Sequence, residues 1–148
     1  SGGGPRDDVG SSLVAFEDGS CAVGGAFSGR GTFYSTRRSD PVTWDSAGES
    51  DAILLYVNAQ GYVAWSHRVG GLRADGCTAL ARVAGDRFLA TGYFSSQATF
   101  PVIPPGDEEP TETEDGVPLP TETIRLTARG ETDAFVAGFL PPPTDADD

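Results

Sequence analysis

The chain repeats part of its own sequence at a fixed spacing. Three apolar residues of the first half recur 67 positions later, so that Leu13, Phe27 and Phe33 return as Leu80, Phe94 and Phe100. Internal repetition of this kind is the signature of proteins built from one repeated supersecondary unit. It constrains the fold strongly, because both halves of the chain must form the same local structure.

Composition narrows the fold class and the classes of partner. The chain has 148 residues, which suits one domain, and 20 glycines, 11 prolines and 38% hydrophobic residues favour short strands and turns over long helices. A formal net charge of −12 argues against binding to nucleic acid or to an anionic membrane. No apolar run approaches the roughly 20 residues that span a bilayer, so membrane insertion is not expected. No segment with the basic start and apolar middle of a signal peptide is present, Met is absent, and the sequence as given begins Ser-Gly-Gly-Gly. We therefore expect a mature or trimmed product.

Each half begins with a predicted hairpin. In the first half, strand-like segments at 12–16 and 21–27 flank a polar turn containing Gly19. In the second half, their counterparts are 78–83 and 88–94. The two hairpins align at the spacing of 67, so we expect them to have the same structure.

A second hairpin follows in the first half. Segments 51–57 and 62–69 are joined by Asn58-Ala59-Gln60-Gly61, in which the glycine suits a turn position with positive φ. Segment 133–139 repeats 51–57 at the larger spacing of 82 (133 − 51), which places an insertion between the two units.

The insertion, 104–122, consists almost entirely of Pro, Thr, Glu, Asp and Gly. Such a segment buries too little apolar area to offset its ordering entropy, and we expect a mobile, solvated acidic loop. Calcium chelation is the alternative, although the segment lacks the ligand spacing and rigid glycine of known calcium loops. The candidate ligands are Asp107, Glu108, Glu109 and Asp115.

The order of these elements resembles the bacterial SBBP-type β-propeller repeat. The residues that carry the resemblance are Gly70-Gly71, Asp75, Thr91-Gly92-Tyr93-Phe94, Asp133-Ala134-Phe135-Val136-Ala137 and, in the first unit, Gly61 and Trp65. The resemblance implies an all-β fold made of antiparallel four-stranded propeller-blade-like repeats. It also implies a bacterial protein that is secreted, periplasmic or on the cell surface.

The count of predicted strands is about seven, four in the first unit and three in the second. We expect one β-repeat domain, with unit 1 at about 1–70, unit 2 at about 71–140 and an acidic, proline-rich tail at 141–148. The prolines at 141–143 cannot donate ladder hydrogen bonds, so the fourth strand of unit 2 is missing. Because propellers need at least four blades, one copy gives an incomplete propeller. We therefore expect a homo-oligomer, such as a trimer, or further repeats that complete the ring; the remaining alternative is that the two blades pack as a sandwich-like unit.

Residues suited to catalysis are few. His67 is the only histidine and lies in a predicted strand, which favours a structural position over a general base. Asp7, Asp8 and Asp75 resemble a glycosidase carboxylate set, but Asp8 and Asp75 are repeat-equivalent, which favours turn bracing. No motif for a catalytic triad, a phosphate loop or a zinc site is present, and we expect no cofactor and no catalytic residues.

The candidate binding residues lie in a loop that the repeat does not share. Tyr34, Arg37 and Arg38 follow Phe33 and have no repeat counterpart, and function concentrates on loops over a rigid scaffold. Cys21 and Cys77 permit one disulfide in an oxidising compartment, and otherwise are small buried residues.

These observations lead to one main hypothesis and two alternatives. The main hypothesis is a non-catalytic extracytoplasmic binding or scaffold module whose loops bind a protein or a glycan. The first alternative is a polysaccharide-acting hydrolase fragment that needs residues from other blades or copies. The second is a structural spacer in a cell-surface protein.

Overall fold

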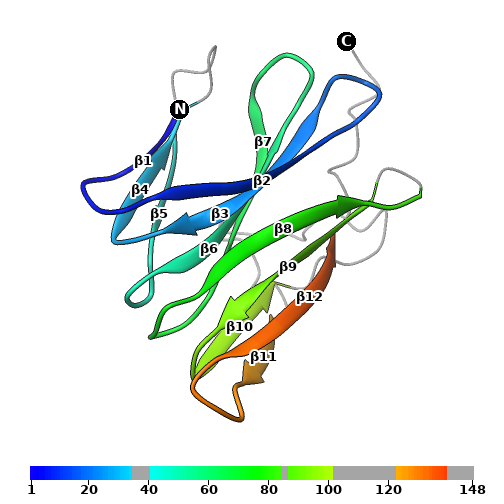
Figure 1. Ribbon diagram of the computed structural model, residues 1–148. Coiled ribbons are helices and arrows are strands. Elements are labelled where there is room, and N and C mark those ends of the chain that lie inside the picture. The colour runs from blue at the N-terminus through cyan, green and yellow to red at the C-terminus, as the bar shows by residue number, and fades with distance from the viewer. Residues whose placement is uncertain (35–40, 85–86, 102–122, 140–148) are drawn as a thin grey trace, which may run out of the picture.

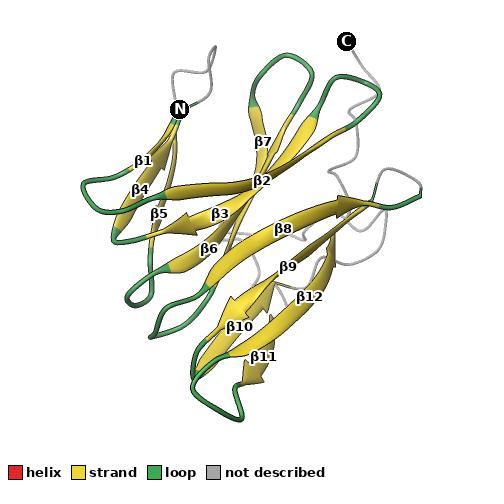
Figure 2. Ribbon diagram, viewed as in Figure 1, coloured by secondary structure: helices red, strands yellow, loops and turns green. Residues whose placement is uncertain are grey.

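The structure is a computed structural model that describes residues 1–34, 41–84, 87–101 and 123–139, and within these ranges it contains strands and no helix (Figures 1 and 2). The all-β, antiparallel prediction is therefore confirmed. The strands in chain order are β1 (Gly2–Gly3), β2 (Val9–Ala15), β3 (Cys21–Phe27), β4 (Arg30–Phe33), β5 (Val42–Asp45), β6 (Asp51–Val57), β7 (Val63–Val69), β8 (Gly76–Arg82), β9 (Phe88–Phe94), β10 (Gln97–Pro101), β11 (Thr123–Thr127) and β12 (Asp133–Phe139).

The first main sheet has the order β2-β3-β6-β7. Its two predicted hairpins are present, and each turn is made by the residues that the sequence indicated. Gly19 and Gly61 have φ of 88° and 85°, a conformation that favours glycine. The Asn58 side chain accepts hydrogen bonds from the Gln60 and Tyr62 amides at 3.2 and 2.9 Å. Local turn chemistry therefore fixes the register of the β6–β7 hairpin.

The second main sheet has the order β8-β9-β12 and repeats the first three strands of the first sheet. The correspondence includes an irregularity in pairing. The first strand of each sheet has a bulge at the same repeat position, between Gly10 and Ser12 in β2 and between Cys77 and Ala79 in β8. In the described residues no strand pairs with the outer edge of β12. The residues that would form the fourth strand, 140–148, lie outside the described residues, so its absence stays a prediction.

Each unit also contains a short hairpin that the sequence analysis missed. In the first unit β4 pairs with β5 and with β1, and in the second unit β10 pairs with β11. The count of about seven strands is therefore wrong, because the described part of the chain has twelve. The seven predicted strands all lie in the two main sheets, and the additional strands form the small sheets.

The two main sheets pack face to face (Figure 1). At their contact, β2 of the first sheet lies next to β8 of the second. One core joins the sheets and includes Ala22 and Leu54 from the first and Phe88 and Phe135 from the second. A second, smaller cluster of Phe27, Phe33 and Ile53 lies under the β4–β5 hairpin. None of the sheets closes into a ring or barrel within the described residues. No helix long and apolar enough to cross a membrane occurs among them.

Candidate functional site

Asp8 and Asp75 brace equivalent turns, as the repeat predicted. Asp75 Oδ2 accepts a hydrogen bond from the Gly71 amide at 2.7 Å, and its Oδ1 accepts one from Ser95 at 2.9 Å. Asp8 makes the same pair of contacts with the amides of Gly4 and Ser28, at 2.6 and 3.3 Å. Each carboxylate thereby ties a glycine loop to the end of the neighbouring strand. This prediction is confirmed, and the glycosidase-like role for Asp7, Asp8 and Asp75 has no geometry to support it.

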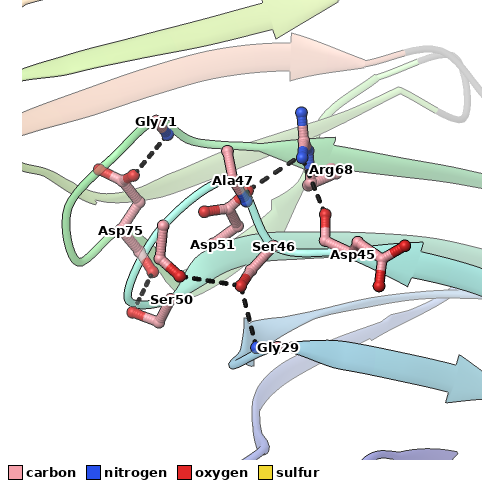
Figure 3. Close-up of polar contacts among 10 residues, drawn as sticks. Gly29, Asp45, Ser46, Ala47, Ser50, Asp51, Arg68, Gly71 and Asp75 are labelled. Carbon is pink, nitrogen blue, oxygen red and sulfur yellow. Dashed lines mark hydrogen bonds and ion pairs between the residues drawn. The ribbon is translucent and has the colours of Figure 1, made fainter.

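Asp51, at the start of β6, is the most deeply buried carboxylate that the structure describes. Its Oδ2 accepts a hydrogen bond from the Ala47 amide at 2.9 Å and lies 3.3 Å from Arg68 Nε (Figure 3). Its Oδ1 is buried without a hydrogen-bond partner. Burial raises the pKa of Asp51 to about 6, against the opposing effects of the Ala47 amide and the Arg68 charge. Asp51 is therefore partly protonated near neutral pH.

Asp75 lies beside Asp51 at the junction of the two main sheets (Figure 3). The two segments are joined by a parallel bridge between Ser50 and Ala74, and the Asp75 amide donates to Ser50 O at 2.9 Å. Burial also raises the pKa of Asp75, and the Asp75 charge further raises that of Asp51. Two carboxyl groups with raised pKa values at one place are a feature of acid–base sites.

The junction carboxylates are closed to an external substrate. The relative exposure is 0% for Asp51 and 1% for Asp75. The repeat gives their structural role, because Asp133 occupies the position of Asp51 and accepts a hydrogen bond from the Arg129 amide at 3.1 Å. A contact that recurs with the fold indicates a brace. We therefore assign the Asp51–Asp75 pair to the joint between the sheets. Neither Asp51 nor Arg68 was predicted as a site residue from the sequence, although the recurrence of Asp51 as Asp133 at the spacing of 82 was a signal for the position.

His67 lies in β7, half-buried, with its ring 4.3 Å from that of Trp65 in an edge-to-face arrangement. Burial lowers the pKa of His67 to about 4, so the imidazole is neutral at neutral pH. Trp65 in turn packs against Phe88 and Phe139 of the second sheet. The structural position predicted for His67 is confirmed.

An open hollow of about 770 Å³ lies beside β1 and contains one of the predicted binding residues. Tyr34, at the end of β4, is 57% exposed, and its amide donates to Ser1 O at 2.7 Å. Arg6, Asp7 and Asp8 also line the hollow. An exposed phenol, a guanidinium and carboxylates around one hollow provide both a flat apolar surface and hydrogen-bonding groups. Arg37 and Arg38 lie outside the described residues.

The metal and disulfide candidates have different outcomes. Asp107, Glu108, Glu109 and Asp115 lie outside the described residues, and among those that are described no three metal-ligating side chains cluster.

Cys21 and Cys77 are free, so the disulfide is not present in this structure. The physical reason is that Cys77 Sγ packs over Gly24, whereas Cys21 lies three residues from Gly24 along β3 and projects from the opposite face. Burial raises the pKa of the Cys77 thiol to about 11, which fits the alternative of a small buried residue.

The chain shows no match to a protein-family model, a curated protein or a solved structure. Its likeness to the SBBP-type repeat stays a prediction from the sequence.

Proposed function

We propose that this chain is a non-catalytic extracytoplasmic binding or scaffold module, and that its two main sheets are consecutive blades of a β-propeller. The extracytoplasmic location rests on the resemblance of the repeats to the bacterial SBBP type. The propeller and the binding role are supported by observations on the structure.

The propeller is supported by the way in which the sheets meet. β2 and β8, the first strands of the two sheets, lie side by side and are joined by polar contacts. Ser11 Oγ donates to Cys77 O at 2.5 Å, and the Leu80 amide donates to Ser12 Oγ at 3.0 Å. Adjacent blades of a propeller place equivalent strands side by side around a central channel. The contacts between β2 and β8 therefore support the proposal of consecutive blades.

The single observation that carries the binding role is the hollow beside Tyr34. Gly2 and Gly3 of β1 line it, and β1 is held to β4 by backbone pairing between Gly2 and Phe33 and between Gly3 and Thr32. A rigid frame with an exposed aromatic ring suits a protein or glycan partner, because ring faces stack on sugars and peptide groups while the charged groups fix orientation. Tyr34 lacks a counterpart in the second unit, so its presence is not explained by the repeat.

The test is a glycan and peptide array combined with an unbiased hydrolase screen on the wild-type chain. We expect saturable binding without turnover, and we expect Tyr34→Ala to weaken it at least tenfold without changing the melting temperature. The matched control is Tyr62→Ala in the β6–β7 turn, away from the hollow, which should bind as the wild type does. Turnover of a polysaccharide would contradict the non-catalytic role, and binding that survives Tyr34→Ala would remove the hollow as the site.

A further inference from the structure

Each main sheet has one face buried against the other sheet and one face that the described structure leaves largely open. On the open face of the first sheet, Leu55 packs against the small aromatic cluster and Trp44 Nε1 donates to Ser66 Oγ at 3.0 Å. The docked face of the first sheet is formed by Val14, Ala22, Gly24, Leu54 and Tyr56. The docked face of the second sheet is formed by Leu80, Phe88, Ala90, Phe135, Ala137 and Phe139. The open face of the first sheet carries Leu13, Cys21, Val23, Leu55 and Val57, and that of the second sheet carries Ala79, Ala81, Leu89, Thr91 and Val136.

Both open faces are apolar and accessible. Leu13, on the edge strand β2 of one face, is 61% exposed, and Val136, on the edge strand β12 of the other, is 73% exposed. Side chains of this size that stand together on a sheet face mark an interaction surface more often than isolated exposed residues do.

The repeat relates each open face to a docked face. Leu13, Val23 and Leu55 of the open first face are the counterparts of Leu80, Ala90 and Ala137 of the docked second face. In the same way Leu89, Thr91 and Val136 of the open second face are the counterparts of Ala22, Gly24 and Leu54 of the docked first face. The open face of the second sheet is thus equivalent in sequence to the docked face of the first, and the open face of the first sheet to the docked face of the second. The two open faces could therefore pack against each other as the two docked faces do.

Side-chain sizes at the centre of the contact are complementary in both cases. In the internal contact a Cβ added to Gly24 would lie 2.6 Å from Cys77 Sγ, so only glycine fits opposite the cysteine. At the equivalent positions of the open faces the larger Thr91 replaces Gly24 and the smaller Gly10 replaces Cys77. A Cβ added to Gly10 would meet no atom within 4 Å, which leaves space for Thr91. Large and small residues have exchanged sides, as close packing requires.

The aromatic cluster beside each hairpin gives the same indication. Phe94 and Phe100 pack edge to face at 6.4 Å and belong to the core between the sheets. Their counterparts Phe27 and Phe33 pack edge to face at 6.0 Å but form part of a separate cluster at the open face of the first sheet. The β10–β11 hairpin does not obstruct the internal contact, so its counterpart β4–β5 need not obstruct an external one.

The burial of equivalent carboxylates differs between the contact of the two sheets and the open faces. Asp51 and Asp75 are buried because they meet at the junction between the two sheets. Their counterparts Asp133 and Asp8 make the same turn contacts but are only half-buried. Asp8 and Asp133 are therefore the two carboxylates that a further sheet, docked on each open face, would bury.

From these relations we infer that the chain binds a second copy of itself head to tail, the open face of the second sheet in one copy docking on the open face of the first sheet in the next. The contact is heterologous, so it closes into a ring or continues into a chain of copies. Three copies would supply six sheets, within the four to eight blades of known propellers. This inference concerns the sheet faces and does not depend on the ligand of the Tyr34 hollow.

The first test uses two charge variants of the full chain, Leu13→Arg and Val136→Arg, each of which spoils one open face. We expect the wild type to associate by sedimentation velocity from low micromolar to submillimolar protein, and each variant alone to remain monomeric. A mixture of the two retains one intact face of each kind and should form a one-to-one dimer and nothing larger. Leu72→Arg, at a residue 79% exposed in the β7–β8 connection, is the control and should associate as the wild type does.

Two results would overturn the inference. A wild type that stays monomeric at submillimolar concentration would show that the faces do not bind another copy. A Leu13→Arg or Val136→Arg protein that dimerises alone would show a symmetric contact in place of the head-to-tail one. Circular dichroism on each variant distinguishes loss of association from loss of fold.

The second test locates the contact at the level of residues. Gly10→Cys and Thr91→Cys are made separately in a Cys21→Ser background, mixed and oxidised, because their counterparts Cys77 and Gly24 lie within disulfide reach in the internal contact. We expect a cross-linked heterodimer in the mixture and none from either variant alone. Gly130→Cys mixed with Thr91→Cys is the control and should not cross-link. A failure of the Gly10–Thr91 pair to cross-link, or equal cross-linking with Gly130, would refute the proposed register.

Discussion

The buried Asp51 carboxyl predicts that the folded chain loses stability as the pH rises. The pKa of Asp51 is raised by burial from an ordinary value of 3.8 to about 6. Below pH 3.8 the Asp51 carboxyl is protonated in both the folded and the unfolded chain, so its ionisation does not reduce the free energy of unfolding. As the pH passes through the folded-state pKa, the unfolded chain has already ionised while the folded chain resists ionisation. A difference of about two pKa units corresponds to a loss of about 3 kcal/mol on going from low to neutral pH.

Asp51→Asn isolates this effect. The amide retains an oxygen that can accept from Ala47, and Arg68 retains its hydrogen bond of 2.8 Å from Nη1 to Asp45 O. The attraction of Arg68 acts on Asp51 only when the carboxyl is ionised, and it is already contained in the folded-state pKa of about 6, so the ion pair is not an additional loss. The pKa of Asp75 is also raised by burial, so part of the decline with pH should remain in the variant.

Urea unfolding of both proteins between about pH 4 and pH 8 measures the difference. We expect the free energy of unfolding of Asp51→Asn, relative to wild type, to rise by up to about 3 kcal/mol across that range. Asp45→Asn is the control of opposite sign, because the Arg30 guanidinium lowers the pKa of the exposed Asp45 carboxyl. A relative stability of Asp51→Asn that is constant with pH, or that falls as the pH rises, would refute the reasoning.

Three further substitutions test the packing and the turns, each by urea unfolding. Leu54→Ala, at a side chain 1% exposed between the sheets, should lower the free energy of unfolding by about 2 to 5 kcal/mol, and a loss below this range would contradict the packed core. Gly71→Ala should cost at least about 2 kcal/mol because its Cβ would clash with Gln97 O, whereas Gly130→Ala has open space and should be nearly neutral. Ser96→Gly should stabilise the chain by about 1 kcal/mol, because Ser96 has a φ of 67° that favours glycine, and a destabilised variant would show that the hydroxyl outweighs the strain.

The repeat made most of the main-sheet architecture predictable. Comparison of the two halves of the sequence predicted seven strands and the turn roles of Asp8 and Asp75, because each of these depends on local chemistry that both units share. The strand boundaries were less accurate. β2 begins at Val9 and not at the predicted residue 12, since the bulge after Gly10 breaks the alternation on which the prediction relied.

The short hairpins and the buried charge could not be obtained in the same way. β4 and β5 have four residues each, which is too short for an alternating pattern to stand out. The recurrence of Phe33 as Phe100 and of Trp44 as Leu126 was the available signal. Asp51 and Asp133 are equivalent in sequence but differ in burial, because burial depends on which sheet has a neighbour. No comparison of the units with each other can show that difference.

The asymmetry between the two units bears on how strongly copies associate. β7 is present only in the first sheet, and its Trp65 packs against Phe88 and Phe139 at one end of the internal contact. In a contact between copies the corresponding positions on the receiving face are the smaller Cys21 and Val57, and the described second sheet has no strand equivalent to β7. That end of the contact would bury less aromatic surface, which weakens it relative to the internal one. We therefore expect copies to separate on dilution while each chain keeps both of its sheets packed together.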